Sequence, residues 1–278
     1  MSCSVCDDTG WKAIDESGVR RVIRCECWRE AIIGTLFGAA RIPRRYQHCE
    51  LSNFVTYSNE RLLNAVARAR KFAEAFPVVD KGLFLIGPPG IGKSHLAVAV
   101  LKQVIRERGA RGLFYDVREL LKVIRSTYDP VVRTTETEIL QPVMVADLLV
   151  LDDLGAEKTS EWVGETLNLI VNTRYNERRL TIFTSNYEEK EDRTDPESLL
   201  VRVGGRMHSR LYEMCEFLEY EGADFRHRPP NAGADDLLAM WQLQSRAASL
   251  PRKTGGQARA QLRDGRGELK WPGGRAGH

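Results

Sequence analysis

Gly87-Pro88-Pro89-Gly90-Ile91-Gly92-Lys93-Ser94 is a complete match to the phosphate-binding pattern G-x-x-x-x-G-K-[ST]. It lies between residues 82–86, an apolar run typical of a buried strand, and residues 95–108, which carry apolar residues at helical spacing. Glycines let the backbone curl so that successive N–H groups surround phosphate oxygens at the positive end of a helix. Lys93 then reaches the terminal phosphates and Ser94 holds Mg²⁺. The alternative, a glycine-rich turn before an ordinary helix, is disfavoured by the complete pattern in this setting. The residues expected to contact a nucleoside triphosphate are Gly87, Pro88, Pro89, Gly90, Ile91, Gly92, Lys93, Ser94 and His95.

A second motif ends in two carboxylates. Residues 147–153 read Asp-Leu-Leu-Val-Leu-Asp-Asp, which is typical of a Walker B strand. Parallel strands place their last residues at the carboxyl edge of the sheet, where ligands of open α/β folds bind. We expect Asp152 to hold Mg²⁺ and Asp153 to polarise the water that attacks the γ-phosphate. The pair favours hydrolysis over nucleotide storage, although an acidic strand end that caps the next helix is the alternative.

A third apolar run, residues 180–186, also ends in polar groups. Its last residue, Asn186, is predicted to lie on a neighbouring strand, from which its amide can orient the attacking water. We therefore interpret Asn186 as a sensor residue.

Arginines follow in the next helical segment. Arg202, Arg206 and Arg210 recur every four residues, which predicts that they lie along one helix face. A guanidinium presented to a neighbouring subunit's γ-phosphate would act as an arginine finger, and Arg226 is a candidate to act on the nucleotide of its own chain. A solvated basic helix face is the alternative for these side chains.

Taken together, residues 85–97, 148–155 and 184–186 resemble the AAA+ ATPases of the DnaC, DnaI and IstB group. The resemblance covers about residues 40–228 and includes the basic-aromatic segment 41–46. It implies an AAA+ P-loop core that binds ATP with Mg²⁺. Members of the group load the replicative helicase on DNA or assist a transposase, so the resemblance implies one of these as the protein partner, with single-stranded DNA as a second ligand.

The resemblance also implies roles for two arginines. Arg210 ends the segment 206–210, which lies where the group carries its finger motif, and Arg226 matches the sensor 2 arginine. Self-association through the ATP site follows from a finger that acts on a neighbour. One departure concerns Asp153, because AAA+ proteins more often place Glu after the Walker B Asp. The shorter side chain predicts slow hydrolysis.

Cysteines mark a different chemistry at the amino-terminal end. Four of the six cysteines lie in the first tenth of the chain. Between the two pairs, residues 11–14 and 19–23 look like strands of a hairpin whose closure would bring the thiols together. Four thiolates suit tetrahedral Zn²⁺, which predicts a zinc-ribbon-like module; a reduced cluster without metal and disulfides are the alternatives. The predicted zinc ligands are Cys3, Cys6, Cys25 and Cys27.

The two remaining cysteines, Cys49 and Cys215, stand alone beside apolar neighbours. We interpret both as packing residues. His48, next to Cys49, is a weak candidate for a metal ligand.

Length and composition agree with one α/β core and small appendages. The chain has 278 residues and a net charge of +3, too small by itself to indicate a nucleic-acid partner. It contains no apolar run of about 18 residues and no signal-peptide pattern, so we expect a cytoplasmic protein with no membrane contact. The predicted domains are a zinc-binding module and helix (1–40), a linker (41–60), an AAA+ ATPase core (61–228), and a short helix with a disordered basic tail (229–278).

Strands and helices are expected to alternate in the core, which predicts a parallel, doubly wound sheet. Residues 129–140 are expected to form a polar excursion, and no full helical lid is expected after the core. Strands are predicted at 82–86, 112–116, 147–152, 180–185 and 216–220, and helices at 30–40, 61–76, 93–108, 117–127, 160–177 and 235–250.

A DNA-contacting surface is harder to place. Residues 117–128 combine the cations Arg118, Lys122 and Arg125 with Tyr128 at the end of the predicted helix. Cations and stacking rings are the mixture that single-strand binding uses. A solvated helix face whose aromatic ends complete the core is the alternative.

These features favour an ATP-driven loader of a replicative helicase. A transposase helper ATPase is the alternative within the same group. From other classes, a P-loop kinase for a small molecule would need an acceptor pocket and a mobile lid, and an ATP-binding adaptor would hardly turn over. The pair Asp152 and Asp153 together with Asn186 favours hydrolysis.

Overall fold

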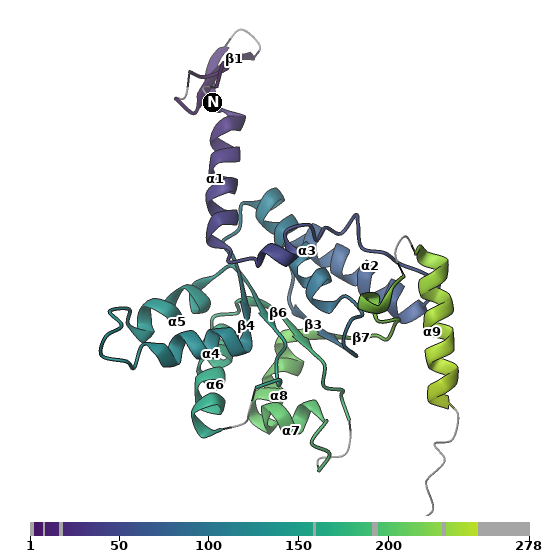
Figure 1. Ribbon diagram of the computed structural model, residues 1–278. Helices are drawn as coiled ribbons and strands as arrows, with labels where there is room; N and C mark the ends of the chain where they lie inside the picture. Colours follow the sequence, from purple (N-terminus) through teal and green to yellow (C-terminus); the bar gives the residue numbers. More distant parts are fainter. Residues whose placement is uncertain are drawn as a thin grey trace, which may run out of the picture.

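A five-stranded parallel sheet forms the centre of the molecule, with helices on both faces (Figure 1). The strand order is β4-β5-β6-β3-β7. This confirms the predicted α/β core. The computed structural model describes residues 3–249, apart from 8, 17–18, 158–159, 191–193 and 230–231. The strands are β3 (Gly82–Ile86), β4 (Gly112–Asp116), β5 (Leu148–Asp152), β6 (Leu180–Ser185) and β7 (Cys215–Glu219).

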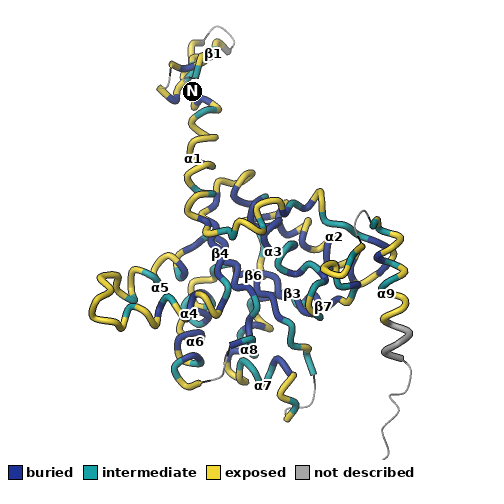
Figure 2. Tube along the Cα trace, viewed as in Figure 1, coloured by how far each residue is buried: buried dark blue, intermediate teal, exposed yellow. Residues whose placement is uncertain are grey.

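The side chains of each strand alternate between the two faces of the sheet, which divides the core into two layers. Leu83 and Leu85 of β3 pack into one buried cluster, whereas Phe84 and Ile86 pack into the other. Successive side chains of a strand point to opposite faces, so a strand that is apolar throughout is buried by helices on both sides. Figure 2 shows the strands as the most buried part of the molecule. The first layer contains α2 (Glu60–Ala75) and α3 (Lys93–Arg108), and the second contains α4 (Val117–Ser126), α5 (Glu136–Val145), α6 (Glu161–Asn176), α7 (Leu199–Val203) and α8 (Gly205–Met214).

The amino-terminal hairpin stands apart from this core (Figure 1). Strands β1 (Trp11–Glu16) and β2 (Val19–Arg24) pair antiparallel, with Trp11 opposite Arg24. They are followed by α1 (Glu26–Ala39), which begins four residues earlier than expected. None of the residues of α1, all of which are described, is buried, and Figure 2 shows most of the helix as exposed.

Residues between α1 and α2 pack on the core. They contain a short 3₁₀ turn, η1 (Arg44–Tyr46), and the buried side chains of Cys49, Leu51 and Tyr57. Cys49 therefore packs in the core, as predicted, and so does Cys215 at the start of β7. After β7 come a second 3₁₀ turn, η2 (Phe225–His227), and α9 (Ala234–Ser249). The predicted basic tail, residues 251–278, lies outside the described residues.

Two local predictions were wrong. Arg202, Arg206 and Arg210 do not share one helix face, because α7 ends at Val203 and Gly204 has a φ of 80° that breaks the helix. Arg206 and Arg210 lie on α8, one turn apart.

The polar segment 129–140 is not irregular throughout, because α5 begins within it. Thr135 and Glu138 form a capping box in which each side chain bonds the other residue's backbone N–H. At the other end of α5, Arg174 of α6 is buried and its Nη1 donates to the carbonyl oxygens of Val143, Met144 and Ala146. No helix among the described residues is long and apolar enough to cross a membrane.

Candidate nucleotide site

The loop between β3 and α3 has a backbone that only glycine allows. Gly87, Gly90 and Gly92 all have positive φ, of 149°, 85° and 94°. A Cβ atom at Gly90 would collide with the carboxyl group of Asp224, and one at Gly87 would collide with the carbonyl oxygen of Tyr220. The loop leads directly into the amino-terminal end of α3, so its N–H groups and the helix dipole are available to an anion.

Lys93 is buried at the base of this loop. Its Nζ donates to the carbonyl oxygens of Gly87 and Pro88, each at 2.7 Å, and to Oδ1 of Asn186 at 2.7 Å. Burial lowers its pKa to about 8, against the opposing effect of the carboxylates of Asp153 and Asp152. The ammonium thus lies inside the loop that a triphosphate would occupy.

Asp152 closes β5 beside the first turn of α3. Its carboxylate accepts a hydrogen bond from Thr184 Oγ1 at 2.7 Å and another from Ser94. Burial raises its pKa, and these two hydrogen bonds oppose that effect. Hydroxyl and carboxylate oxygens are the ligands that Mg²⁺ takes in P-loop proteins. The two predicted magnesium ligands therefore lie together.

Asp153 adopts a strained backbone, with a φ of 65°. Its N–H donates to Thr184 Oγ1 at 2.9 Å, which links it to β6. Its Oδ1 accepts from Asn186 Nδ2 at 2.5 Å. Because Asn186 also accepts from Lys93, the structure joins three of the predicted site residues in one hydrogen-bonded line.

One residue of this site was assigned elsewhere. Arg118, in the first turn of α4, donates from Nη2 to Asp153 Oδ2 at 3.1 Å. From the sequence, Arg118 was a candidate DNA contact, with a solvated helix face as the alternative. The sequence did contain one indication that Arg118 belongs to the nucleotide site. Arg118 follows the strand 112–116, whose carboxyl end lies at the same sheet edge as Asp152. That signal requires β4 to neighbour β5, and strand order cannot be read from the motifs alone.

Arg226 lies near the loop and Arg210 lies elsewhere on the core. Arg226 is in η2, where the N–H of Phe225 donates to the carbonyl oxygen of Gly90 at 3.0 Å, and its charge helps to lower the pKa of Lys93. Arg210 is half-buried on α8, near Tyr175 of α6. The structure brings Arg226 to the loop of its own chain and leaves Arg210 as a candidate for a neighbour's site.

His95 follows Ser94 on α3, but its ring contacts the linker. Its Nε2 lies 3.0 Å from Asn53 Oδ1 and 3.3 Å from the carbonyl oxygen of Glu50. Its ring also meets Phe54 edge-on, with the centroids 5.2 Å apart. Any contact of His95 with nucleotide stays a prediction.

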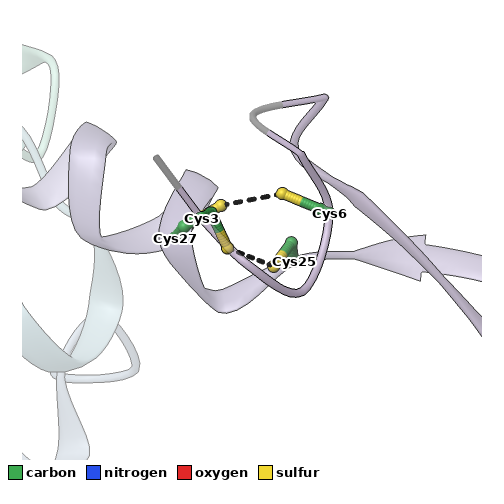
Figure 3. A group of neighbouring side chains, drawn as sticks. All are labelled: Cys3, Cys6, Cys25 and Cys27. Atoms are coloured by element: carbon green, nitrogen blue, oxygen red, sulfur yellow. Dashed lines mark hydrogen bonds between the residues drawn. The ribbon is translucent and has the colours of Figure 1, made fainter. Parts of the chain in front are cut away.

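The four amino-terminal cysteines converge where the hairpin meets α1 (Figure 3). Cys3 Sγ lies 3.8 Å from Cys25 Sγ, and Cys6 Sγ lies 3.2 Å from Cys27 Sγ. None of the four forms a disulfide, and their sulfur atoms lie within 4.8 Å of one another. Sulfurs about 3.8 Å apart are what a tetrahedral zinc ion with Zn–S bonds of about 2.3 Å requires. The donor set and its spacing fit zinc.

The parallel sheet, the glycine loop with its buried lysine, and the acidic strand end define a P-loop nucleotide-binding protein. Comparison with known proteins identifies the family within this class. Residues 47–230 match the family described as IstB-like ATP binding protein. The matched residues make up more than half of the chain. The chain belongs to this family.

Relatives and solved structures agree with this assignment. The chain is 30% identical over 155 residues to the replicative helicase loader DnaC of Escherichia coli (strain K12), a match of 55% of this chain and 62% of that protein. It is similar to the crystal structure of the DnaC helicase loader, with a TM-score of 0.57 and 34% identity over 64% of this chain and all of that one. It also resembles the crystal structure of DnaI, with a TM-score of 0.53 and 25% identity over 67% of this chain and 95% of that one.

Proposed function

We propose that this protein binds Mg²⁺ and ATP at the loop 87–94 and hydrolyses ATP to ADP and phosphate. The observation that carries the proposal is the hydrogen-bonded line of Lys93, Asn186 and Asp153. It joins a cation for the phosphates to a carboxylate for water through an amide that can orient both. A P-loop kinase would need an acceptor pocket at this place instead.

Each residue then has a separate task. Lys93 exchanges its carbonyl partners for phosphate oxygens, and Mg²⁺ on Ser94 and Asp152 would neutralise charge on the β- and γ-phosphates. Asp153 accepts the proton of a water whose oxygen forms a bond to the γ-phosphorus, while the bond from that phosphorus to the bridging oxygen breaks. Asn186 orients this water. Because Asp153 also holds Arg118, we expect slow turnover.

The proposed site is tested by Lys93→Ala, with Lys71→Ala on the exposed surface of α2 as the matched control. Fluorescent ATP binding and phosphate release are measured on both variants. We expect Lys93→Ala to lose binding or turnover and the control to keep both. Normal affinity and normal turnover in Lys93→Ala would refute the site.

We further propose that the ATPase loads or remodels a replicative helicase on single-stranded DNA. The similarity to DnaC proteins supports this partner over a transposase. Support for DNA comes from an aromatic and basic surface made by the exposed Arg125 and Tyr128 and the partly buried Trp162. Arg125 lies over the Trp162 ring at 4.6 Å, and Trp162 Nε1 donates to the hydroxyl of Tyr128 at 3.2 Å. Tyr128 is 54% exposed and able to stack on a base.

The DNA surface is tested by Tyr128→Ala in an anisotropy assay with a single-stranded oligonucleotide. Stacking of about 1 kcal/mol or more per base predicts a loss of affinity of about 5-fold or more. Leu169→Ala, at an exposed position of α6, is the control. Equal affinity in both variants would remove this surface from the proposal.

The protein partner is tested by co-purification of the full chain with the replicative helicase and with the transposase of the same cell. We expect the helicase to be retained, and more so with ATP than without. Retention of the transposase alone would favour the helper role and reject the loader.

We also propose that the four amino-terminal cysteines bind one Zn²⁺ and that this module contacts the partner. Its apolar surface includes Trp11 and Val22 on the hairpin and Trp28 on α1, all exposed. Arg24 lies between the two indole rings, 3.7 Å from that of Trp11 and 4.2 Å from that of Trp28. Metal analysis of Cys25→Ser against the unmodified chain tests the zinc, because the variant should lose bound zinc. Unchanged zinc content would contradict the assignment.

A further inference from the structure

A second group of metal-binding side chains lies outside both sites described above. It consists of His48 and Cys49 in the linker and His95 in the first turn of α3. One ligand atom from each lies within 4.8 Å of the others, and Cys49 Sγ lies 3.9 Å from His48 Nε2. The two imidazole rings meet edge-on, with centroids 5.9 Å apart. These residues are separate from the four amino-terminal cysteines.

We propose that His48, Cys49 and His95 form a binding site for a Zn²⁺-like transition-metal ion, which fastens the linker to the start of α3. Two imidazoles and one thiolate are the borderline-soft donors that such ions prefer. Donors of a tetrahedral zinc ion lie about 3.5 Å apart, so the three side chains need to close by about 1 Å. The fourth position is left for water. When the ion binds, the Cys49 thiol loses its proton to solvent and a metal–sulfur bond forms.

The backbone around these donors is already held in place. Lys102 of α3 donates from Nζ to the carbonyl oxygens of Gln47 at 2.6 Å and Cys49 at 3.0 Å. The carboxylate of Glu50 pairs with Lys102 and with Arg106 of α3. These contacts fix residues 47–50 against the helix that carries His95. Binding of an ion therefore costs little further conformational entropy.

The hydrogen bonds of His95 indicate which of its ring nitrogens is available to a metal. Its Nε2 faces Asn53 Oδ1 and the carbonyl oxygen of Glu50, and both of these oxygens are acceptors in that pairing. Nε2 therefore carries the proton, and the neutral ring keeps its lone pair on Nδ1. Metal-binding histidines commonly donate their other ring N–H to a carbonyl or carboxylate in this way.

The proposed metal site is buried on the side of Cys49 and open to solvent on the side of His48. Cys49 is 1% exposed and His95 is partly buried, whereas His48 lies at the surface. An ion can enter past His48 and be held against the packed side. The site would act on the phosphate loop, because His95 follows Ser94 and its neighbour Phe54 lies against Gly92.

The metal content of the full chain tests the proposal. The protein is saturated with Zn²⁺, exchanged into metal-free buffer and analysed for zinc per chain. We expect His48→Gln to lose one bound Zn²⁺ relative to the unmodified chain, while Cys25→Ser loses the zinc of the amino-terminal cluster independently. His227→Gln, an exposed imidazole elsewhere, is the matched control and should lose none. Cys49→Ser is a second variant, but His48→Gln changes only a surface side chain and should not disturb folding.

Co²⁺ titration provides an independent readout. In the Cys25→Ser/Cys27→Ser background we expect Co²⁺ to give a thiolate charge-transfer band that disappears with His48→Gln and persists with His227→Gln. The unfolding temperature of the same background should rise with Zn²⁺ only when His48 is present. Equal zinc content in His48→Gln and the unmodified chain, or a cobalt spectrum that does not depend on His48, would overturn the proposal.

Discussion

The bond between Arg118 and Asp153 predicts that Arg118→Ala raises the basal rate of ATP hydrolysis. Arg118 Nη2 holds Asp153 Oδ2 at 3.1 Å, which withdraws one carboxylate oxygen from water. The Arg118 side chain is 58% exposed and that of Asp153 is 24% exposed, so solvent screens the pair. Exposed pairs of this kind contribute about 0.2–1 kcal/mol. Releasing that energy corresponds to a rate increase of about 1.4-fold to 5-fold.

The assay is steady-state phosphate release at saturating ATP, without DNA or partner protein. Lys122→Ala, one turn further along α4, removes the same charge from an exposed position that is not bonded to Asp153, and should leave the rate unchanged. Thermal unfolding of both variants checks that the fold is intact. A rate for Arg118→Ala at or below that of the unmodified protein, with normal stability, would refute the reasoning that Arg118 restrains Asp153.

Four other outcomes are expected. Asp153→Glu should raise turnover by extending the carboxylate towards water; unchanged or lower turnover means that reach is not limiting. Arg210→Ala should preserve ATP binding and abolish turnover that depends on self-association, and an equal rate in dilute monomers and assemblies of the variant would count against the finger. Binding of ATP by the free protein should weaken as the pH rises through about 8, because Lys93, whose pKa is lowered to about 8 by burial, then loses the proton that the phosphates require; a flat profile contradicts this. Arg174→Met should lower the free energy of unfolding by about 3 kcal/mol in urea, since several buried carbonyl oxygens lose their donor; a loss below about 1 kcal/mol would show that water replaces the guanidinium.

The local motifs of this chain were readable because their chemistry depends on neighbours in sequence. The glycine loop, Lys93 and the acidic end of β5 follow from a few consecutive residues each. Arg118 was missed because its contact depends on β4 lying beside β5, which no short motif encodes. The break at Gly204 was missed because four-residue spacing was given more weight than a glycine pair.

The start of α5 shows a signal that was present and overlooked. Thr135 and Glu138 have the spacing of a capping box, but the polar composition around them indicated a loop. The burial of Arg174 could not be predicted from the sequence, because a cation in the last turn of a helix is normally interpreted as exposed. Arg174 donates to carbonyl oxygens at the end of α5, and this contact depends on how α5 and α6 pack together.

Helix α1 holds the hairpin at a distance from the core, so a small rotation of the helix at its base moves the hairpin by a larger amount. Its 14 residues extend about 21 Å at 1.5 Å per residue. At its root the carbonyl oxygen of Ala40 accepts from the N–H of Phe114 in β4, two residues before the strand end that precedes Arg118. A tilt of about 10° at this root moves the far end of the helix by about 4 Å. Small adjustments at the β4 edge would therefore become larger displacements of the hairpin, the module proposed to contact the partner.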